Sequence, residues 1–255
     1  MRRSVRERQL TFAISLAAII FGHAQARAQG GSRAEPEPPR TAKAAALFDI
    51  RGYWVAVVTE DWRFRMVTPP KGDYTAVFLN AEGRKLADAW DPAKDEASGE
   101  QCKSYGAPNL LRVPGRIHIT WQDDQILKIE TDAGQQTRLF YFGASQSPGG
   151  GWQGISKASW DVVLGGRGQA PVGSLRVLTT NLKPGYLRKN GVPYSAGTVL
   201  TEYFDRADEP NGDSYLLITA TVEDPTYLSQ PFVTASHFRK QADGSGWNPT
   251  PCSAR

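Results

Sequence analysis

Residues 116–142, RIHITWQDDQILKIETDAGQQTRLFYF, decide the fold class of this chain. Apolar side chains alternate with polar ones from Arg116 to Trp121, which is the period of a half-buried β-strand. A polar turn, QDDQ (122–125), comes next, and Ile126–Thr131 is predicted to return beside the first strand as a hairpin. The segment TRLFYF (137–142) predicts a third strand. The stretch therefore predicts an antiparallel meander.

The same pattern recurs along the rest of the chain, interrupted by turn-forming residues. Further strands are predicted over Trp54–Val58, Lys157–Val163, Leu175–Thr180, Val199–Phe204, Tyr215–Val222 and Phe232–Arg239. One helix is predicted over Ala81–Trp90, with Asn80 as its N-cap and Asp91-Pro92 as its end. Closing such a meander into a barrel removes its exposed edges. We predict an all-β, mainly antiparallel closed barrel of about eight to ten strands with one short inserted helix.

The N-terminus has the features of an export signal. Four arginines precede a twelve-residue apolar segment (10–21), and small-x-small cleavage sites follow it at 24–26 and 26–28. The apolar segment is shorter than the about 20 residues that a membrane span needs. We predict a signal peptide over residues 1–28, with an uncleaved amphipathic anchor as the alternative. A flexible linker is predicted over 29–45, and one barrel domain over 46–252. The expected location is periplasmic or secreted.

The charge of the exported part excludes one class of partner. Residues 1–28 contain five of the 30 Lys and Arg residues and one of the 26 Asp and Glu residues, which leaves 25 of each. A nucleic-acid binder needs a basic surplus to neutralise phosphates, so no nucleic-acid partner is expected. No segment after the signal is long and apolar enough to cross a bilayer. The pattern leaves the oligomeric state open.

The two cysteines, Cys102 and Cys252, have two interpretations. In an oxidising compartment a lone pair is most simply a disulfide, and the alternative is two free thiols. A disulfide would close a loop that on the chain-entropy model stabilises by roughly 4–5 kcal/mol.

Two resemblances accompany this pattern. DIRGYW (49–54) resembles the Gly-x-Trp start of lipocalin-type barrels, which implies a last-strand arginine stacked on Trp54, and Arg239 matches that position. Secreted bacterial proteins of uncharacterised function with a lipocalin-like (calycin-type) barrel resemble this chain in four ordered segments: LNAEGRKLADAWDP (79–92), LRVLTTNLKPG (175–185), GVPYSAGTVLTEYFDR (191–206) and VEDPTYLSQPF (222–232). The resemblance implies a fold and a compartment but no activity. Many of those proteins have His-Ser where this chain has Tyr194-Ser195, so no role of that histidine carries over.

Two titratable residues on late strands are candidate catalytic groups. Alternation places Glu202 on the face of Leu200 and Phe204, where burial would raise its pKa. The alternative is that Glu202 points outward or pairs with an arginine across the sheet. His237 shares a face with Arg239 and would point inward if Arg239 closes the barrel, although a structural histidine is the alternative. An interior Glu202–His237 pair would suit acid/base chemistry.

Two loop segments carry candidate binding residues. Residues 183–195 combine Tyr186 and Tyr194 with Arg188, which suits either a binding loop at the barrel mouth or a packed surface loop. EDWRFR (60–65) alternates aromatic and basic side chains, which predicts an amphipathic strand or arginines that hold a carboxylate.

The leading functional hypothesis is a periplasmic or secreted barrel that binds a small apolar or aromatic molecule in its interior. One alternative is a cofactor-free isomerase, hydratase or lyase that uses Glu202 and His237, and another is an envelope structural or assembly protein without a small-molecule site. No cofactor and no metal site are expected, because the mature histidines have no ligand cluster beside them. The candidate ligand-binding residues are Trp54, Trp121, Tyr186, Arg188, Tyr194, Tyr203 and Arg239.

Overall fold

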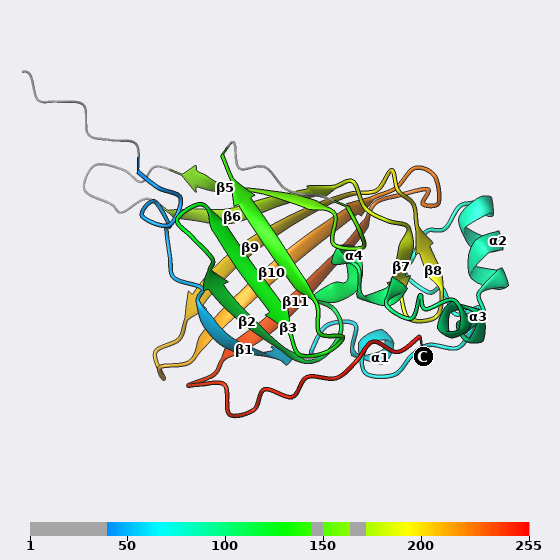
Figure 1. Cartoon of the computed structure of the whole chain (residues 1–255), viewed down its shortest axis with the longest axis horizontal. Helices are drawn as coiled ribbons and strands as arrows, with labels where there is room; N and C mark the ends of the chain where they lie inside the picture. The colour runs from blue at the N-terminus through cyan, green and yellow to red at the C-terminus, as the bar shows by residue number, and fades with distance from the viewer. Residues whose placement is uncertain (1–39, 144–149, 164–171, 255) are drawn as a thin grey trace, which may run out of the picture. The chain divides into compact units, whose positions relative to one another are not determined.

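A closed barrel of nine strands forms the centre of the computed structural model (Figure 1). The structure describes residues 40–143, 150–163 and 172–254. The predicted signal peptide and most of the predicted linker lie outside these residues. The barrel strands are β1 (Gly52–Val57), β2 (Arg116–Trp121), β3 (Ile126–Thr131), β4 (Thr137–Phe142), β5 (Ile155–Val163), β6 (Val172–Thr180), β9 (Val199–Asp208), β10 (Ser214–Glu223) and β11 (Phe232–Lys240).

The strand order around the barrel is β1-β11-β10-β9-β6-β5-β4-β3-β2, and β1 closes it by pairing with both β11 and β2. The predicted closed all-β barrel is thereby confirmed. One neighbouring pair, β4 and β5, is parallel, whereas the other pairs in the barrel are antiparallel. A parallel pair needs a long connection, and residues 143–154 supply it.

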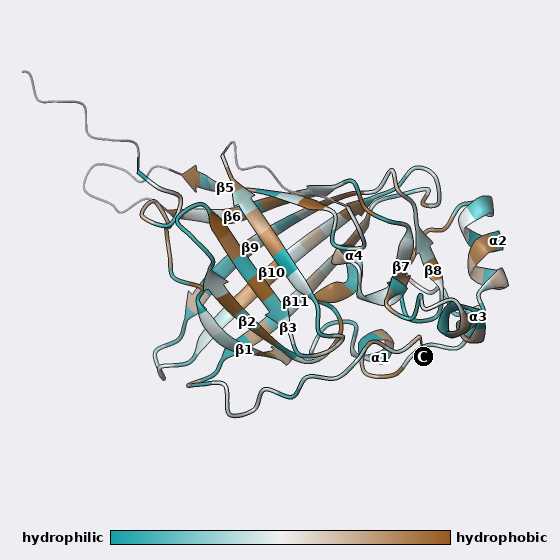
Figure 2. Ribbon diagram, viewed as in Figure 1, coloured by the Kyte–Doolittle hydropathy of each residue, from teal (hydrophilic) through white to brown (hydrophobic). Residues whose placement is uncertain are grey.

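Alternation along the strands fills the barrel with apolar side chains, and Figure 2 shows brown and teal residues alternating along them. The fully buried members of this core include Trp54, Ile119, Ile129, Phe140, Leu175, Val177, Phe204 and Leu216. The rings of Phe140 and Phe204 lie 5.4 Å apart between centroids, and the Trp54 indole N–H donates to the Ile50 carbonyl oxygen at 2.9 Å. The centre of the barrel is therefore a packed core, as is usual for small barrels, and not the hollow that the leading hypothesis expects.

The chain packs against the barrel earlier than expected. Residues 41–45, expected in the linker, form a turn in which the Lys43 N–H donates to the Asp124 carbonyl oxygen at 3.1 Å. Ala42 joins the barrel core. The small apolar side chain and the hydrogen bond together hold this turn in place.

Short elements that the sequence pattern did not reveal cover one end of the barrel. We call them, together with α2, the cap: α1 (Trp62–Arg65), α2 (Ala81–Ala89), α3 (Pro92–Ala97), the 3-10 turn η1 (Lys103–Tyr105), α4 (Ala107–Leu110), β7 (Gly185–Arg188) and β8 (Val192–Tyr194). In Figure 1 several of them lie beyond the barrel end at the right. A second apolar core joins the cap to the barrel, and it contains Leu187, Val192 and Tyr194 with Leu200, Val222 and Phe232.

Helix α2 forms where it was predicted. The Asn80 side chain accepts a hydrogen bond from the Gly83 N–H at 2.9 Å, as an N-cap does. Gly83 is required for packing, because a Cβ there would lie 2.4 Å from the Tyr227 carbonyl oxygen. Asp91 and Pro92 end α2 and also begin α3, in which Asp91 caps the Ala93 N–H and proline takes a first-turn position.

The predicted strand over 60–65 is wrong. Residues Trp62–Arg65 form the single helical turn α1, preceded by Asp61 in the left-handed conformation at φ 52°. In a strand Arg63 and Arg65 would share a face, whereas the helical turn leaves Arg63 exposed and buries Arg65.

The structure joins Cys102 and Cys252 in a disulfide, as the first interpretation predicted. Cys102 directly precedes η1, and Cys252 lies in the C-terminal tail. The tail also pairs with the β3–β4 turn, where the Gly134 N–H donates to the Thr250 carbonyl oxygen at 2.9 Å. The disulfide therefore joins the cap to the tail, and the hydrogen bonds of the tail join it to the barrel.

Replacing Gly191 with alanine is expected to lower the free energy of unfolding by about 3 kcal/mol, measured by urea denaturation. Gly191 forms the β7–β8 turn at φ +82°, and a Cβ there would lie 2.1 Å from the Trp90 ring. Gly72→Ala is the matched control, because Gly72 has φ +91° but no atom within 4 Å of its Cβ position. We expect about 1 kcal/mol for Gly72→Ala. Equal losses for the two variants would contradict the close packing of Trp90 on this turn.

Candidate functional site

The two candidate catalytic residues lie on opposite faces of the sheet. Glu202 points into the barrel and is 2% exposed. His237 points outward, because the inward positions of β11 are those of Phe232, Thr234, Ser236 and Phe238. The His237 Nδ1 atom lies 3.2 Å from a carboxylate oxygen of Glu60, outside the barrel. The prediction that His237 faces the interior with Glu202 is therefore wrong.

Glu202 instead forms a buried ion pair, which is the alternative considered for it. Two Arg138 nitrogens, Nη1 and Nη2, donate to the two Glu202 carboxylate oxygens at 3.0 and 2.7 Å. The hydroxyls of Ser156 and Thr179 accept further hydrogen bonds from Arg138 Nη2. One sequence signal could have revealed this partner. Arg138 lies two and four residues before Phe140 and Phe142, so the alternation of a strand places all three on the inward face of β4.

Barrel closure over Trp54 uses a lysine, not the expected arginine. Arg239 is exposed, and it is the Lys240 ammonium group that lies 4.4 Å from the centroid of the Trp54 ring. Lys240 also donates to the Arg51 carbonyl oxygen. The prediction for Arg239 is wrong by one residue, and a shift of one residue along a strand reverses the face.

The predicted aromatic walls do not share a cavity. Trp54 is fully buried in the barrel core, whereas Tyr203 lies on the outward face of β9, between the inward Glu202 and Phe204. Trp121 is half-buried at the strand end, with its ring centroid 5.4 Å from that of Phe142.

The loop predicted to carry binding residues does border a cleft, which lies in the cap and not in the barrel. We call it the cap cleft. It has a volume of about 520 Å³ and lies between α2–α3 on one side and β7–β8 on the other. Its apolar and aromatic walls come from Leu86, Trp90, Pro184, Tyr186, Pro193, Tyr194 and Tyr227.

Three polar groups meet at this cleft. The Asp95 carboxylate, whose residue is 5% exposed, accepts hydrogen bonds from the Lys103 ammonium group at 2.7 Å and from the Tyr186 hydroxyl at 2.9 Å. Burial and then the hydrogen bond to Asp95 raise the pKa of the Tyr186 phenol, so it stays protonated. Burial opposes the charge of Lys103, but hydrogen bonds to Asp95 and Glu100 outweigh it and raise the pKa of Lys103.

Two further donors at the cap cleft lack partners. The indole N–H of Trp90 and the hydroxyl of Tyr194 are buried and have no hydrogen-bond partner in the part of the chain that the structure describes. Burial raises the pKa of the Tyr194 phenol as well. The charged side chains that line the cleft are three carboxylates, Asp91, Asp95 and Glu100, against two ammonium groups, Lys94 and Lys103. The cleft is therefore slightly acidic.

Arg188, the third residue predicted on this loop, does not line the cap cleft. It points into a separate small pocket beside Phe64 and Arg112. Within the described residues, no group of three or more His, Cys, Asp or Glu side chains is arranged to hold a metal ion, and no helix is long and apolar enough to cross a membrane.

Comparison of the chain with family models, with curated proteins and with solved structures finds no match. The resemblance to secreted lipocalin-like proteins therefore stays a prediction.

Proposed function

We propose that this protein binds a small amphipathic molecule in the cap cleft, outside the cytoplasm. The expected ligand has an aromatic or aliphatic body and a polar group that is uncharged or cationic. The predicted signal peptide and the disulfide between Cys102 and Cys252 support the periplasmic or secreted location.

The observation that carries the proposal is the buried Asp95 carboxylate, bonded to the half-buried Lys103 and Tyr186 side chains at the edge of an aromatic-walled cleft. Small-molecule sites are typically clefts of about 300–1,000 Å³ with mostly apolar walls and a few convergent polar groups, and the cap cleft fits this description. Titratable groups with shifted pKa values, such as Tyr186 and Lys103, concentrate at functional sites.

Different residues of the cleft would contact the apolar body and the polar group of the ligand. The Trp90 and Tyr186 rings offer flat apolar surface to the body of the molecule. Asp95 is held in one orientation by its two donors, so its position is preorganised for a polar group of the ligand. The excess of carboxylates disfavours an anionic ligand by like-charge repulsion.

Thermal unfolding with three matched indoles tests this ligand class: tryptamine, indole and indole-3-acetate. We expect stabilisation in that order, because the cationic member meets the acidic cleft and the anionic member is repelled. A ligand at 100 times its Kd adds about 2.7 kcal/mol, which is about 5–10 °C for a domain of this size.

Ala89→Trp should abolish the shift, since Ala89 is exposed at the end of α2 and lines the cleft, so a large side chain there obstructs it. Ala81→Trp is the matched control, because Ala81 is exposed at the other end of the same helix and does not line the cleft. Absence of any shift at millimolar indole, or an equal shift in the two variants, would overturn the proposal.

A further inference from the structure

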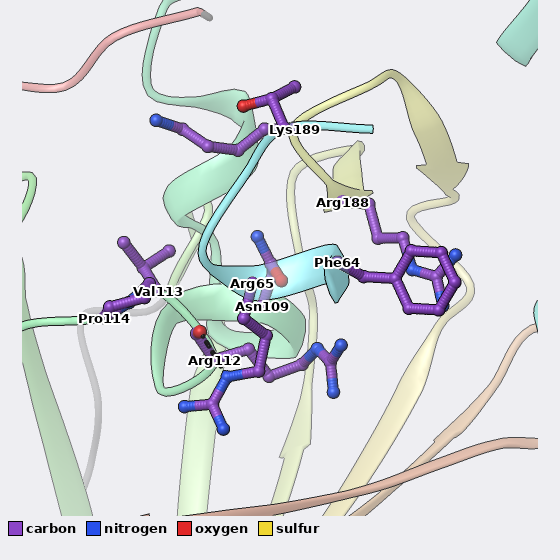
Figure 3. Close-up of a pocket in the computed structure, with 9 residues that line it drawn as sticks. Phe64, Arg65, Asn109, Arg112, Val113, Pro114, Arg188 and Lys189 are labelled. Carbon is purple, nitrogen blue, oxygen red and sulfur yellow. Dashed lines mark hydrogen bonds between the residues drawn. The ribbon is translucent and has the colours of Figure 1, made fainter. Parts of the chain in front are cut away.

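Three arginines that are distant in sequence are buried around one small pocket (Figure 3). Arg65 comes from α1, Arg112 follows α4, and Arg188 ends β7; they are 8%, 5% and 2% exposed. The pocket shares no lining residue with the cap cleft. Lys189 also lines the pocket, but its ammonium group lies 5.2 Å from the centroid of the Tyr105 ring. A buried guanidinium group is costly unless a counter-charge and hydrogen bonds compensate it.

Two of the three arginines have a carboxylate partner. Arg65 forms an ion pair with Glu60, and its Nε–H donates to the Arg112 carbonyl oxygen at 2.8 Å. Arg112 Nη1 lies 3.1 Å from an Asp61 carboxylate oxygen.

Arg188 differs from the other two. Its Nη1 donates to the Thr75 carbonyl oxygen at 2.7 Å, but it forms no ion pair within 4.0 Å among residues 40–143, 150–163 and 172–254. Burial and then the charge of Arg112 lower the pKa of Arg188 to about 10, so it remains positively charged at neutral pH.

Guanidinium nitrogens at this pocket are left without partners. Nη2 of Arg65, Nη2 of Arg112, and both Nε and Nη2 of Arg188 are buried and have no hydrogen-bond partner within the described part of the chain. Unpaired donors of this kind are rare in folded proteins, and they indicate a bound group or ordered water.

Aromatic rings hold the Arg188 guanidinium group in a defined plane. Its Cζ atom lies 4.1 Å from the centroid of Phe64 and 5.6 Å from that of Phe232. In Figure 3 the Arg188 guanidinium lies beside the Phe64 ring. Because the N–H bonds of a guanidinium group lie in its plane, stacking on a ring leaves its edge available to a planar acceptor such as a carboxylate.

We propose that this pocket binds a small anion, either a carboxylate group or an inorganic anion, through Arg188 and Arg112. The carboxylates of Asp61 and Asp73 act on Arg188 only from a distance, without an ion-pair contact. The lack of a contacting carboxylate and the unpaired nitrogens carry the proposal. The pocket volume is about 30 Å³. At about 10–15 Å³ for each water-sized site, this space admits one carboxylate group or one compact ion and excludes a larger body. Exposed Thr68 at the edge leaves an entrance from solvent.

Anion titration of the native protein and two variants, followed by thermal unfolding, tests the site. Sodium acetate, chloride and sulfate are compared at equal ionic strength. Arg188→Met keeps an unbranched side chain of similar volume and removes the guanidinium group, so we expect it to weaken anion binding roughly tenfold or more. Arg63→Met is the matched control. Arg63 belongs to α1, as Arg65 does, but it is exposed, is paired with Asp73 and does not line the pocket.

The variants also separate binding from a purely structural role. Without added anion, Arg188→Met should be at least as stable as the native protein, because a buried charge that no carboxylate contacts has been removed. Addition of the anion that binds, whether acetate, chloride or sulfate, should reverse that order. A structural arginine would instead lower the melting temperature in both conditions, and this result would overturn the proposal.

The response to each anion identifies the source. An Arg188-dependent shift with acetate indicates a carboxylate-bearing ligand, and one with chloride or sulfate but not acetate indicates an inorganic ion. Equal shifts in native protein and Arg188→Met overturn the site, because salts also stabilise proteins without specific binding. Crystals of the native protein soaked in sodium bromide or in sodium acetate give a readout without any variant. An anomalous bromide peak or acetate density is expected beside Arg188, and the absence of both contradicts the site.

Discussion

Replacing Arg138 with methionine is expected to lower the free energy of unfolding by about 3–5 kcal/mol. Arg138 and Glu202 are both almost fully buried, and their two-point contact lies among the apolar side chains of the barrel. Removing Arg138 alone leaves the Glu202 carboxylate without a counter-charge in a low-dielectric interior. Urea denaturation monitored by tryptophan fluorescence measures the loss.

A double variant separates the cost of an unpaired charge from the value of the pair. Arg138→Met with Glu202→Leu is expected to recover most of the loss, because both charges are then gone and the volume is retained. Arg206→Met serves as the control, since Arg206 pairs with the exposed Asp208, and exposed pairs contribute about 0–1 kcal/mol. A loss below about 1 kcal/mol for Arg138→Met would contradict a buried pair.

Replacing both cysteines with serine is expected to lower the free energy of unfolding by about 5 kcal/mol, because the unfolded chain loses a cross-link that closes a very long loop. Cys102 and Cys252 are separated by 150 positions in sequence. Unfolding midpoints with and without a phosphine reductant measure the effect. The reductant should shift the native protein and leave the double variant unchanged.

The disulfide also connects stability to the cap cleft. Cys102 immediately precedes Lys103, which holds Asp95 in place. Loss of the disulfide is therefore expected to weaken ligand binding in the cleft as well as stability. A native protein with free thiols by mass spectrometry, or a double variant as stable as the native protein, would contradict the assigned link.

The sequence predicted some residues of the candidate sites and missed others, because the sites combine segments that are distant in sequence. Tyr186 and Tyr194 were found from the sequence as an aromatic loop, and both line the cap cleft. Asp95, the hydrogen-bond partner of Tyr186, gave no sequence signal, because it lies on a short helix 91 residues from Tyr186. The sequence indicated Arg188 as a binding residue and the arginines of 60–65 as possible carboxylate ligands, but nothing in it joined Arg65 and Arg188 to Arg112, since the three come from separate segments.

The sequence by itself determined the elements with strong local patterns. The three strands β2, β3 and β4 have the predicted bounds, and Asn80 caps the predicted helix. Period-two alternation and N-capping act within a few neighbouring residues, so they can be recognised without knowledge of the fold.

Only the tertiary structure decided which face of each strand is buried and which charges meet. His237 and Arg239 point outward because β11 pairs with β1 and β10 in a register that buries Phe238 and places Lys240 on Trp54. Residues 183–195 form β7 and β8 because the cap packs on them. Strand register and long-range packing depend on partners far along the chain, and local alternation has the same appearance for either face.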